Sequence, residues 1–176
     1  MSKAFLVLDD GRIFEGSSWA TTGKTFGEAV FQTGMTGYQE TLTDPSYHKQ
    51  VVVMTAPHIG NTGVNLEDNE SSKIWVAGFV VRNPSSITSN WRSTSDLEEE
   101  LIRQGVVGIS GVDTRAITRH LRDRGLQLQL GAVGAVNGVA VFPSEDSGRS
   151  ALLRLLCGLR LGGLWVALWI RLLELL

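Results

Sequence analysis

Short apolar runs separated by turn-forming residues fill the chain up to Gly125, and this pattern predicts a β-sheet. The run FLVL, the turn DDG at residues 9–11 and the following RIFEG predict a hairpin, because glycine readily takes the positive φ that closes a short turn. Residues 26–32, 50–55 and 74–81 predict three further strands. The second of these contains VVVM, a continuous apolar run typical of a strand buried on both faces.

Helix-start signals follow these predicted strands. Ser95 and Glu98 have the spacing of a capping box, and Gly105 stands at the expected C-terminal cap, so a helix is predicted between them. VVGISGV at residues 106–112 predicts the next strand. This alternation of strands and helices indicates a mixed α/β fold.

The second predicted helix begins at Asp113 or Thr114, either of which can cap it, and ends at Gly125. Ile117 and Leu121 form its apolar edge. The helix also carries a row of arginines, and such a row is more often a solvated face than a docking surface. Solvation is therefore the first interpretation, and docking the second, for Arg115, Arg119, Arg122 and Arg124.

The composition narrows the possible partners. A chain of 176 residues fits one core plus an appendage, and a net charge of -2 gives no long-range attraction to nucleic acid. No nucleic-acid partner is therefore expected. The single cysteine, Cys157, allows no intrachain disulfide, and the first residues lack the apolar core of a signal peptide. These features predict a cytoplasmic chain.

From Leu126 onward the sequence is rich in leucine and loses its cap and turn signals. Residues 151–176 suggest a membrane contact, but the uninterrupted apolar piece between Arg160 and Arg171 is only LGGLWVALWI. A spanning helix needs about 20 apolar residues. A transmembrane segment is therefore not expected, and an interfacial amphipathic helix is the alternative.

Catalytic and metal-binding patterns are missing from the sequence. Cys157 has no neighbouring acid, and all three histidines lie far upstream, so an inert thiol is favoured over a nucleophile. His48 and His58 are separated by a predicted strand and lack a Cys or His partner at ligand spacing. We expect no catalytic residue and no metal site.

The stretch MTGYQETLTDPSY begins with a second capping-box spacing, Thr36 to Gln39, which predicts a short helix over residues 37–42. Pro45 then fits the second position of a turn that begins at Asp44.

After this turn, Ser46, Tyr47 and His48 form a small polar group able to bond to a ligand or a partner domain. Further along, PHIGNTGVN at residues 57–65 lacks the ending of a P-loop and the spacing of a dinucleotide fingerprint. Its glycines are therefore expected to form turns that lead the chain out of the sheet.

Four stretches together carry a resemblance that none carries alone: FGEAVFQTGMTGYQETLTDPSY, PHIGNTGVN with EDNES, SNWR, and GVVGISGVDTRAITRHLRDRG. In this order they resemble the N-terminal domain of the small subunit of glutamine-dependent carbamoyl-phosphate synthase, from about Ala4 to Gly125. The resemblance implies that family's α/β fold, a mixed β/β/α swivelling domain. We assign residues 1–125 to this domain, incomplete at its C-terminal end, and residues 126–176 to a non-matching tail.

The resemblance also implies a function. In the family, the small subunit hydrolyses glutamine and passes ammonia to the large subunit, which uses bicarbonate and two ATP, with magnesium, to make carbamoyl phosphate for arginine and pyrimidine biosynthesis. The N-terminal domain binds the large subunit and borders the glutaminase site. The serine of the family's TDPSY motif helps to hold glutamine, and it matches Ser46. The expected partners are thus the large subunit and glutamine, with no cofactor in this chain.

The sequence also departs from the family. The glutaminase motif Gly-x-Cys-Leu-Gly-x-Gln has no counterpart, since Cys157 is followed by Gly-Leu. We expect a truncated small subunit that is inactive alone, because no acyl-enzyme forms without a nucleophile and a base. A free-standing interaction domain that docks through the arginine-bearing helix, and a peripheral membrane protein, are the alternatives. We hypothesise that residues 126–176 are read out of frame, which fails if no reading frame beyond codon 126 encodes family-like sequence.

Overall fold

The computed structural model describes residues 2–129 and 138–142, with side chains up to residue 123. The leucine-rich residues 143–176, including Cys157 and the suggested amphipathic segment, therefore lie outside the described residues. Within the described ranges, no helix combines the length and the apolar character needed to cross a membrane.

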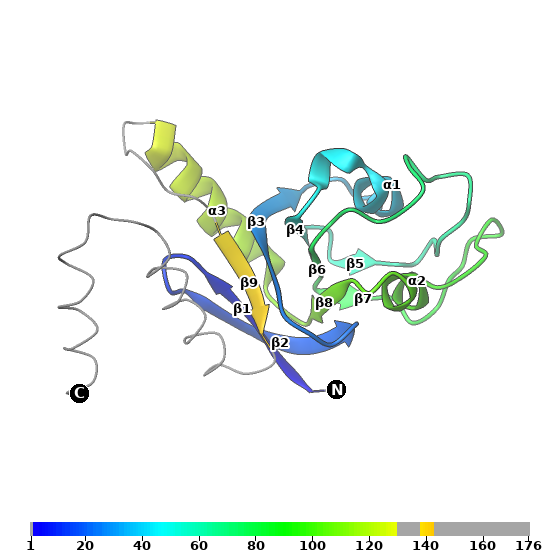
Figure 1. The fold of residues 1–176 in the computed structure, drawn as a ribbon, viewed down its shortest axis with the longest axis horizontal. Helices are drawn as coiled ribbons and strands as arrows, with labels where there is room; N and C mark the ends of the chain where they lie inside the picture. The colour runs from blue at the N-terminus through cyan, green and yellow to red at the C-terminus, as the bar shows by residue number, and fades with distance from the viewer. Residues whose placement is uncertain (1, 130–137, 143–176) are drawn as a thin grey trace.

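The described strands close into a barrel in the order β1-β2-β8-β6-β4-β3-β9 (Figure 1). A separate two-stranded sheet pairs β5 with β7. The strands are β1 (Lys3–Leu8), β2 (Ile13–Ala20), β3 (Thr25–Gln32), β4 (Gln50–Met54), β5 (His58–Ile59), β6 (Gly78–Val80), β7 (Asn83–Pro84), β8 (Val107–Ser110) and β9 (Gly138–Phe142).

The helices lie at two places on this barrel. α1 (Tyr38–Thr43) and α2 (Leu97–Arg103) lie with the long connection between β4 and β8, whereas α3 (Thr114–Gln129) lies near the other end of the molecule (Figure 1). A single 3-10 turn, η1 (Pro45–Tyr47), follows α1.

The barrel has a parallel half and an antiparallel half. β3, β4, β6 and β8 are parallel neighbours, whereas β1 pairs antiparallel with both β2 and β9. One apolar cluster joins β1 to the parallel strands and to α3, and a second joins the parallel strands to α1 and α2. The curled sheet and the helices packed on it confirm the predicted mixed α/β fold class.

Strand β4 contributes to both clusters. Val51 and Val53 point to the first cluster and Val52 and Met54 to the second, and all four are fully buried. Alternate residues of a strand face opposite sides, so a strand covered on both sides must be apolar throughout. The run VVVM therefore has the role predicted for it.

The β1–β2 hairpin also forms as predicted, and Gly11 takes a φ of 84° at its tip. The tip contacts α3, because His120 Nε2 lies 2.7 Å from Asp10 Oδ2 and Arg12 Nη1 lies 3.1 Å from His120 Nδ1. The hairpin and α3 are therefore held in one arrangement.

The start of α2 differs from the prediction. The helix begins at Leu97 after Asp96, which makes no side-chain cap, and Ser95 exchanges backbone hydrogen bonds with Val64. Pairing with Val64 keeps Ser95 extended and outside the helix, so the capping box is wrong. The predicted end at Gly105 is confirmed: this glycine has a φ of 70° and donates to Ile102 O, as in a Schellman motif.

α3 begins as predicted but ends later. Asp113 Oδ1 accepts from Ala116 N at 3.0 Å and caps the helix, which then continues through Gly125 to Gln129. A glycine inside a helix costs about 1 kcal/mol, which does not stop a helix already packed through Ile117 and Leu121. The stop predicted at Gly125 is therefore wrong.

One predicted strand has different limits, and a further strand follows the predicted helices. Of residues 74–81 only Gly78–Val80 form β6, because the N–H groups of Ile74 and Trp75 donate to Gln104 Oε1 and Leu42 O instead. Within VGAVNGVAVF, a segment with no recognisable motif, Gly138–Phe142 form β9 between β1 and β3. The first part of that segment, residues 133–137, lies outside the described residues.

Replacing Leu101 by alanine tests the helical layer. Leu101 is fully buried in the second cluster, so we expect Leu101→Ala to lower the free energy of unfolding by about 2–5 kcal/mol. The neighbouring Ile102 is 53% exposed, and Ile102→Ala is the matched control with a smaller loss. Urea denaturation measures both, and equal losses would contradict this packing.

Candidate functional site

The Asp44–His48 corner is tightly held by local hydrogen bonds. Asp44 Oδ1 accepts from Ser46 N at 2.8 Å, and Tyr47 N donates to Asp44 O at 3.1 Å, which confirms the predicted proline turn. Hydrogen bonds from the Ser46 hydroxyl and backbone N–H lower the pKa of Asp44 below its ordinary value. The corner therefore carries a stable carboxylate beside an exposed serine.

The three polar side chains predicted to act together have different surroundings. Ser46 is exposed, whereas the Tyr47 hydroxyl accepts from Gln32 Nε2 at 3.3 Å and the His48 ring packs edge-on against Trp75 at 5.3 Å. A hydroxyl that donates to a carboxylate still offers lone pairs as acceptors. Ser46, with Asp44 beside it, therefore suits an N–H donor on a ligand.

The start of α1 differs from the predicted capping box. Gly37 occupies the N-cap with a φ of 80° and no side-chain cap forms, so Thr36 and Gln39 are not a capping pair. The Gln39 amide is buried and instead forms hydrogen bonds to the long connection that follows β4. Its Oε1 accepts from Asn65 N at 3.0 Å, while its Nε2 donates to Asn65 O and to Asn69 Oδ1.

Tyr38 also links α1 to the connection that follows β4, through hydrogen bonds of its hydroxyl. Its hydroxyl donates to Gly63 O at 2.6 Å and accepts from Thr62 Oγ1 at 2.8 Å, and burial raises its pKa. Gly60 and Gly63 have φ values of 99° and 66°, so these glycines form turns as predicted. Tyr38 and Gln39 together form a clamp on the loop that begins with PHIGNTGVN.

The other motif stretches meet at this clamp. Arg92 of SNWR forms ion pairs of 2.9 Å with Glu67 and 2.8 Å with Asp68, and Asn65 Nδ2 donates to Asp68 Oδ2 at 2.7 Å. A cavity of about 160 Å³ opens here, lined by Thr36, Gly37, Tyr38, Gln39, Glu40, Thr62, Gly63, Asn65, Asp68 and Asn90. The sequence pattern predicted Gln39 only as half of a capping box and predicted no role for Tyr38.

Three large, exposed apolar residues each directly precede or follow, in the chain, a residue that lines this cavity, and we name them the apolar rim. Met35 is 86%, Leu66 84% and Trp91 91% exposed, and each adjoins a residue that lines the cavity. Exposed apolar groups gathered beside polar ones are typical of interaction sites.

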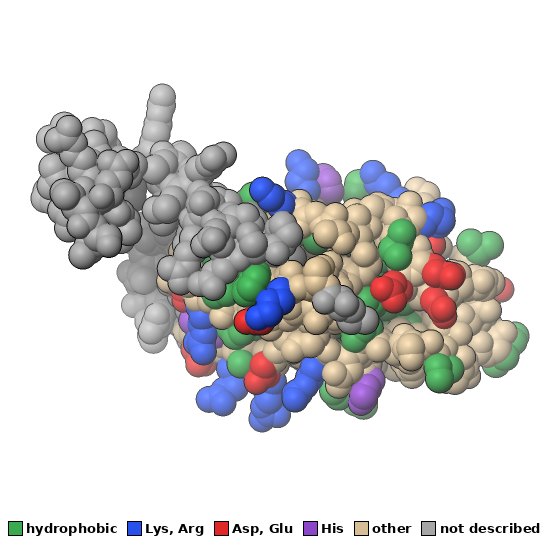
Figure 2. All heavy atoms as spheres, turned by 90° about the horizontal axis from the view of Figure 1, so that it is seen from below, with side chains coloured by type: hydrophobic (Ala, Val, Ile, Leu, Met, Phe, Trp, Pro, Cys, Tyr) green, Lys and Arg blue, Asp and Glu red, His purple; other side chains and the backbone are tan. Residues whose placement is uncertain are grey.

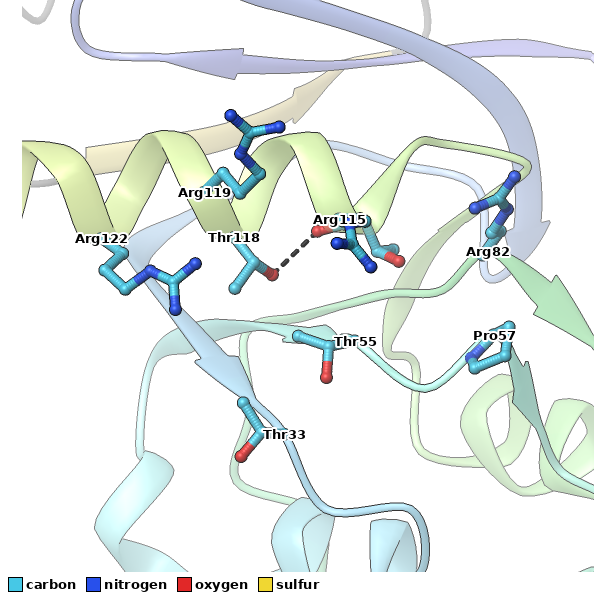
Figure 3. A pocket seen from close by; sticks show the side chains of 9 residues that line it. Thr33, Thr55, Pro57, Arg82, Arg115, Thr118, Arg119 and Arg122 are labelled. Atoms are coloured by element: carbon cyan, nitrogen blue, oxygen red, sulfur yellow. Dashed lines mark hydrogen bonds between the residues drawn. The ribbon is translucent and has the colours of Figure 1, made fainter.

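The arginines of α3 form a second feature. Arg115, Arg119 and Arg122 are exposed, as expected of a solvated face, but they line a cavity of about 560 Å³ together with Arg82 (Figure 3). The Arg124 side chain lies outside the described residues. On the face shown in Figure 2, Lys and Arg lie along both the upper and the lower edges, and one group of Asp and Glu side chains lies toward the right-hand end.

These features define a class of protein: a swivelling β/β/α domain whose described surface offers a rigid corner, a clamped loop and a basic cavity for binding. Its sequence matches the family profile described as the carbamoyl-phosphate synthase small chain, CPSase domain, over residues 6–130. The chain belongs to this family.

Relatives agree with this assignment. The chain is 72% identical over 144 residues to the carbamoyl phosphate synthase small chain of Streptomyces coelicolor, covering 82% of this chain and 37% of the relative. It is 67% identical over 127 residues to that of Mycobacterium tuberculosis, covering 71% and 34%. It is 64% identical over 147 residues to that of Corynebacterium diphtheriae, covering 82% and 38%.

Two limits follow from these matches. The chain spans little more than a third of the length of the relatives. The family match ends at residue 130 and therefore reaches slightly beyond Gly125, where the predicted domain ends.

Removing the Gln39 amide tests the clamp. Gln39→Leu leaves the buried N–H and C=O of Asn65 without partners, at a cost of about 1–3 kcal/mol for each group. We expect reduced stability and faster hydrogen exchange of the Asn65 amide. Gln50→Leu, which removes only an exposed bond to Glu28, is the control. Unchanged exchange at Asn65 would show that the loop does not depend on Gln39.

Proposed function

We propose that this chain is the large-subunit-docking part of the small subunit of a glutamine-dependent carbamoyl-phosphate synthase. The observation that carries the proposal is family membership, with 72% identity to a carbamoyl phosphate synthase small chain. The complete enzyme would make carbamoyl phosphate from glutamine, bicarbonate and two ATP, in the cytoplasm, for arginine or pyrimidine biosynthesis.

Within that enzyme this chain would bind rather than catalyse. Its one cysteine lies in LLCGLR, which is not the family's glutaminase motif, so the chain alone is expected to release no ammonia from glutamine. ATP and magnesium would be used by the large subunit.

The apolar rim is the surface we assign to the large subunit. Met35, Leu66 and Trp91 expose most of their area to water, and burying apolar surface stabilises an interface by about 25 cal/mol per Å² before the costs of association. Gln39 and Tyr38 hold the backbone of Asn65 and Gly63, next to Leu66, so little entropy of this loop is lost on docking.

Co-elution with the large subunit tests the docking role. We expect the chain to co-elute in size-exclusion chromatography and Trp91→Ser to weaken binding at least about tenfold, because buried tryptophans are frequent interface hot spots. Ile102→Ser, an exposed apolar residue on α2, is the control.

Absence of co-elution would refute the docking role. Full binding by Trp91→Ser combined with loss in Arg115→Gln would instead move the docking surface to the arginine-bearing helix.

We further propose that Ser46 forms one edge of the glutamine site. The Ser46 hydroxyl and the Asp44 carboxylate are held together at an exposed corner, and they offer acceptors for the ammonium or amide N–H groups of glutamine. The remaining contacts would come from the glutaminase domain.

Titration of the isotope-labelled chain with glutamine tests this edge. We expect the amide resonances of residues 44–48 to shift with L-glutamine, and Ser46→Ala to weaken the response several-fold while keeping the backbone bond to Asp44. Ser86→Ala, another exposed serine, is the control. An equal response in Ser46→Ala would exclude the hydroxyl as a contact.

A further inference from the structure

The basic cavity is built from two parts of the chain that meet at one edge of the barrel. Arg115, Arg119 and Arg122 stand at i, i+4 and i+7, so they share one side of α3. Arg82 comes from the segment after β6 and completes the set. Figure 3 shows Arg115 and Arg122 on the side of α3 nearer to Thr33 and Thr55 and Arg82 beside the strand end, whereas the Arg119 side chain extends away from these threonines.

The opposite wall consists of residues that follow parallel strands. Thr33 directly follows β3 and Thr55 directly follows β4, with Pro57 beyond. Because β3, β4 and β6 are parallel, their carboxyl ends meet at this edge.

The charge of the cavity is one-sided. Among the described residues, its lining includes four arginines and no carboxylate. In the part of the chain that the structure describes, none of the four forms an ion pair, whereas Arg92 and Arg103 both do. Like charges gathered around one space repel each other, and an anion placed between them removes that repulsion.

The lining also restricts the ligand class. Guanidinium groups bind phosphate and carboxylate oxygens through paired hydrogen bonds, and threonine hydroxyls add further donors. None of the described residues that line the cavity is aromatic, so none of them stacks on a nucleobase. The volume of about 560 Å³ and four positive charges favour more than one anionic group.

We propose that this cavity binds a diphosphate-class oxyanion, either free pyrophosphate or the diphosphate of a nucleotide. Arg115 and Arg122 hold the ligand from α3, and Arg82 holds it from the end of β6. The proposal concerns a site separate from the Asp44–His48 corner and does not depend on the docking role.

Calorimetric titration of the 176-residue chain with inorganic pyrophosphate tests the proposal. We expect saturable one-to-one binding that weakens with added salt. Arg115→Gln and Arg82→Gln, on separate elements, should each weaken it at least about tenfold, as loss of a charge-assisted hydrogen bond does. Circular dichroism verifies that each variant is folded.

Lys24→Gln is the matched control, because this exposed cation precedes β3 at the end opposite Thr33. It should bind pyrophosphate as the unsubstituted chain does. Parallel titrations with ADP and AMP identify the source: equal binding of ADP and pyrophosphate favours a nucleotide diphosphate, and binding of pyrophosphate alone favours the free anion.

Two results would overturn the proposal. One is the absence of pyrophosphate binding at low salt. This result counts against the proposal regardless of whether the arginine variants also fail to bind the large subunit, because the docking role is tested separately. The other is equal weakening by Lys24→Gln and Arg115→Gln, which would mean a diffuse attraction to positive charge.

Discussion

Burial of β4 on both faces is the constraint on which the rest of this structure depends. Val51 and Val53 complete the core shared with β1 and α3, and Val52 and Met54 complete the core shared with α1 and α2. A strand with both faces covered must have a layer on each side, so this short run requires a three-layer domain. Substitution at any of its positions disturbs the cluster that this residue faces.

Parallel pairing around β4 then decides where binding features lie. Parallel strands need long connections, and the connections of β3, β4 and β6 carry the Asp44–His48 corner, the clamped loop and Arg82. Their carboxyl ends meet at one edge, where α3 begins and the basic cavity opens. The sheet provides a rigid frame, and the loops that it positions carry the binding groups.

The family assignment and the local geometry contribute different information about this domain. Similarity to carbamoyl phosphate synthase small chains assigns the domain to their family, and the chain spans about a third of the length of those relatives. The geometry adds what a family name does not specify: acceptors paired at Asp44 and Ser46, a loop held by Gln39, and guanidinium groups without carboxylate partners. These features make each binding role separately testable.

Local sequence was sufficient where the interactions are local. The β1–β2 hairpin with Gly11, the Asp44–Pro45 turn, the end of α2 at Gly105 and the two-sided burial of VVVM all follow from residues close in the chain. Tertiary contacts decided the rest: Ser95 pairs with Val64 instead of capping α2, Gln39 bonds to Asn65 instead of capping α1, and α3 continues past Gly125. The basic cavity also needed the fold, because only the parallel sheet brings Arg82 beside arginines more than thirty positions away. The physical reason is competition from partners distant in the sequence. A side chain that could cap a helix by local contacts instead makes a long-range contact when that contact stabilises the fold more.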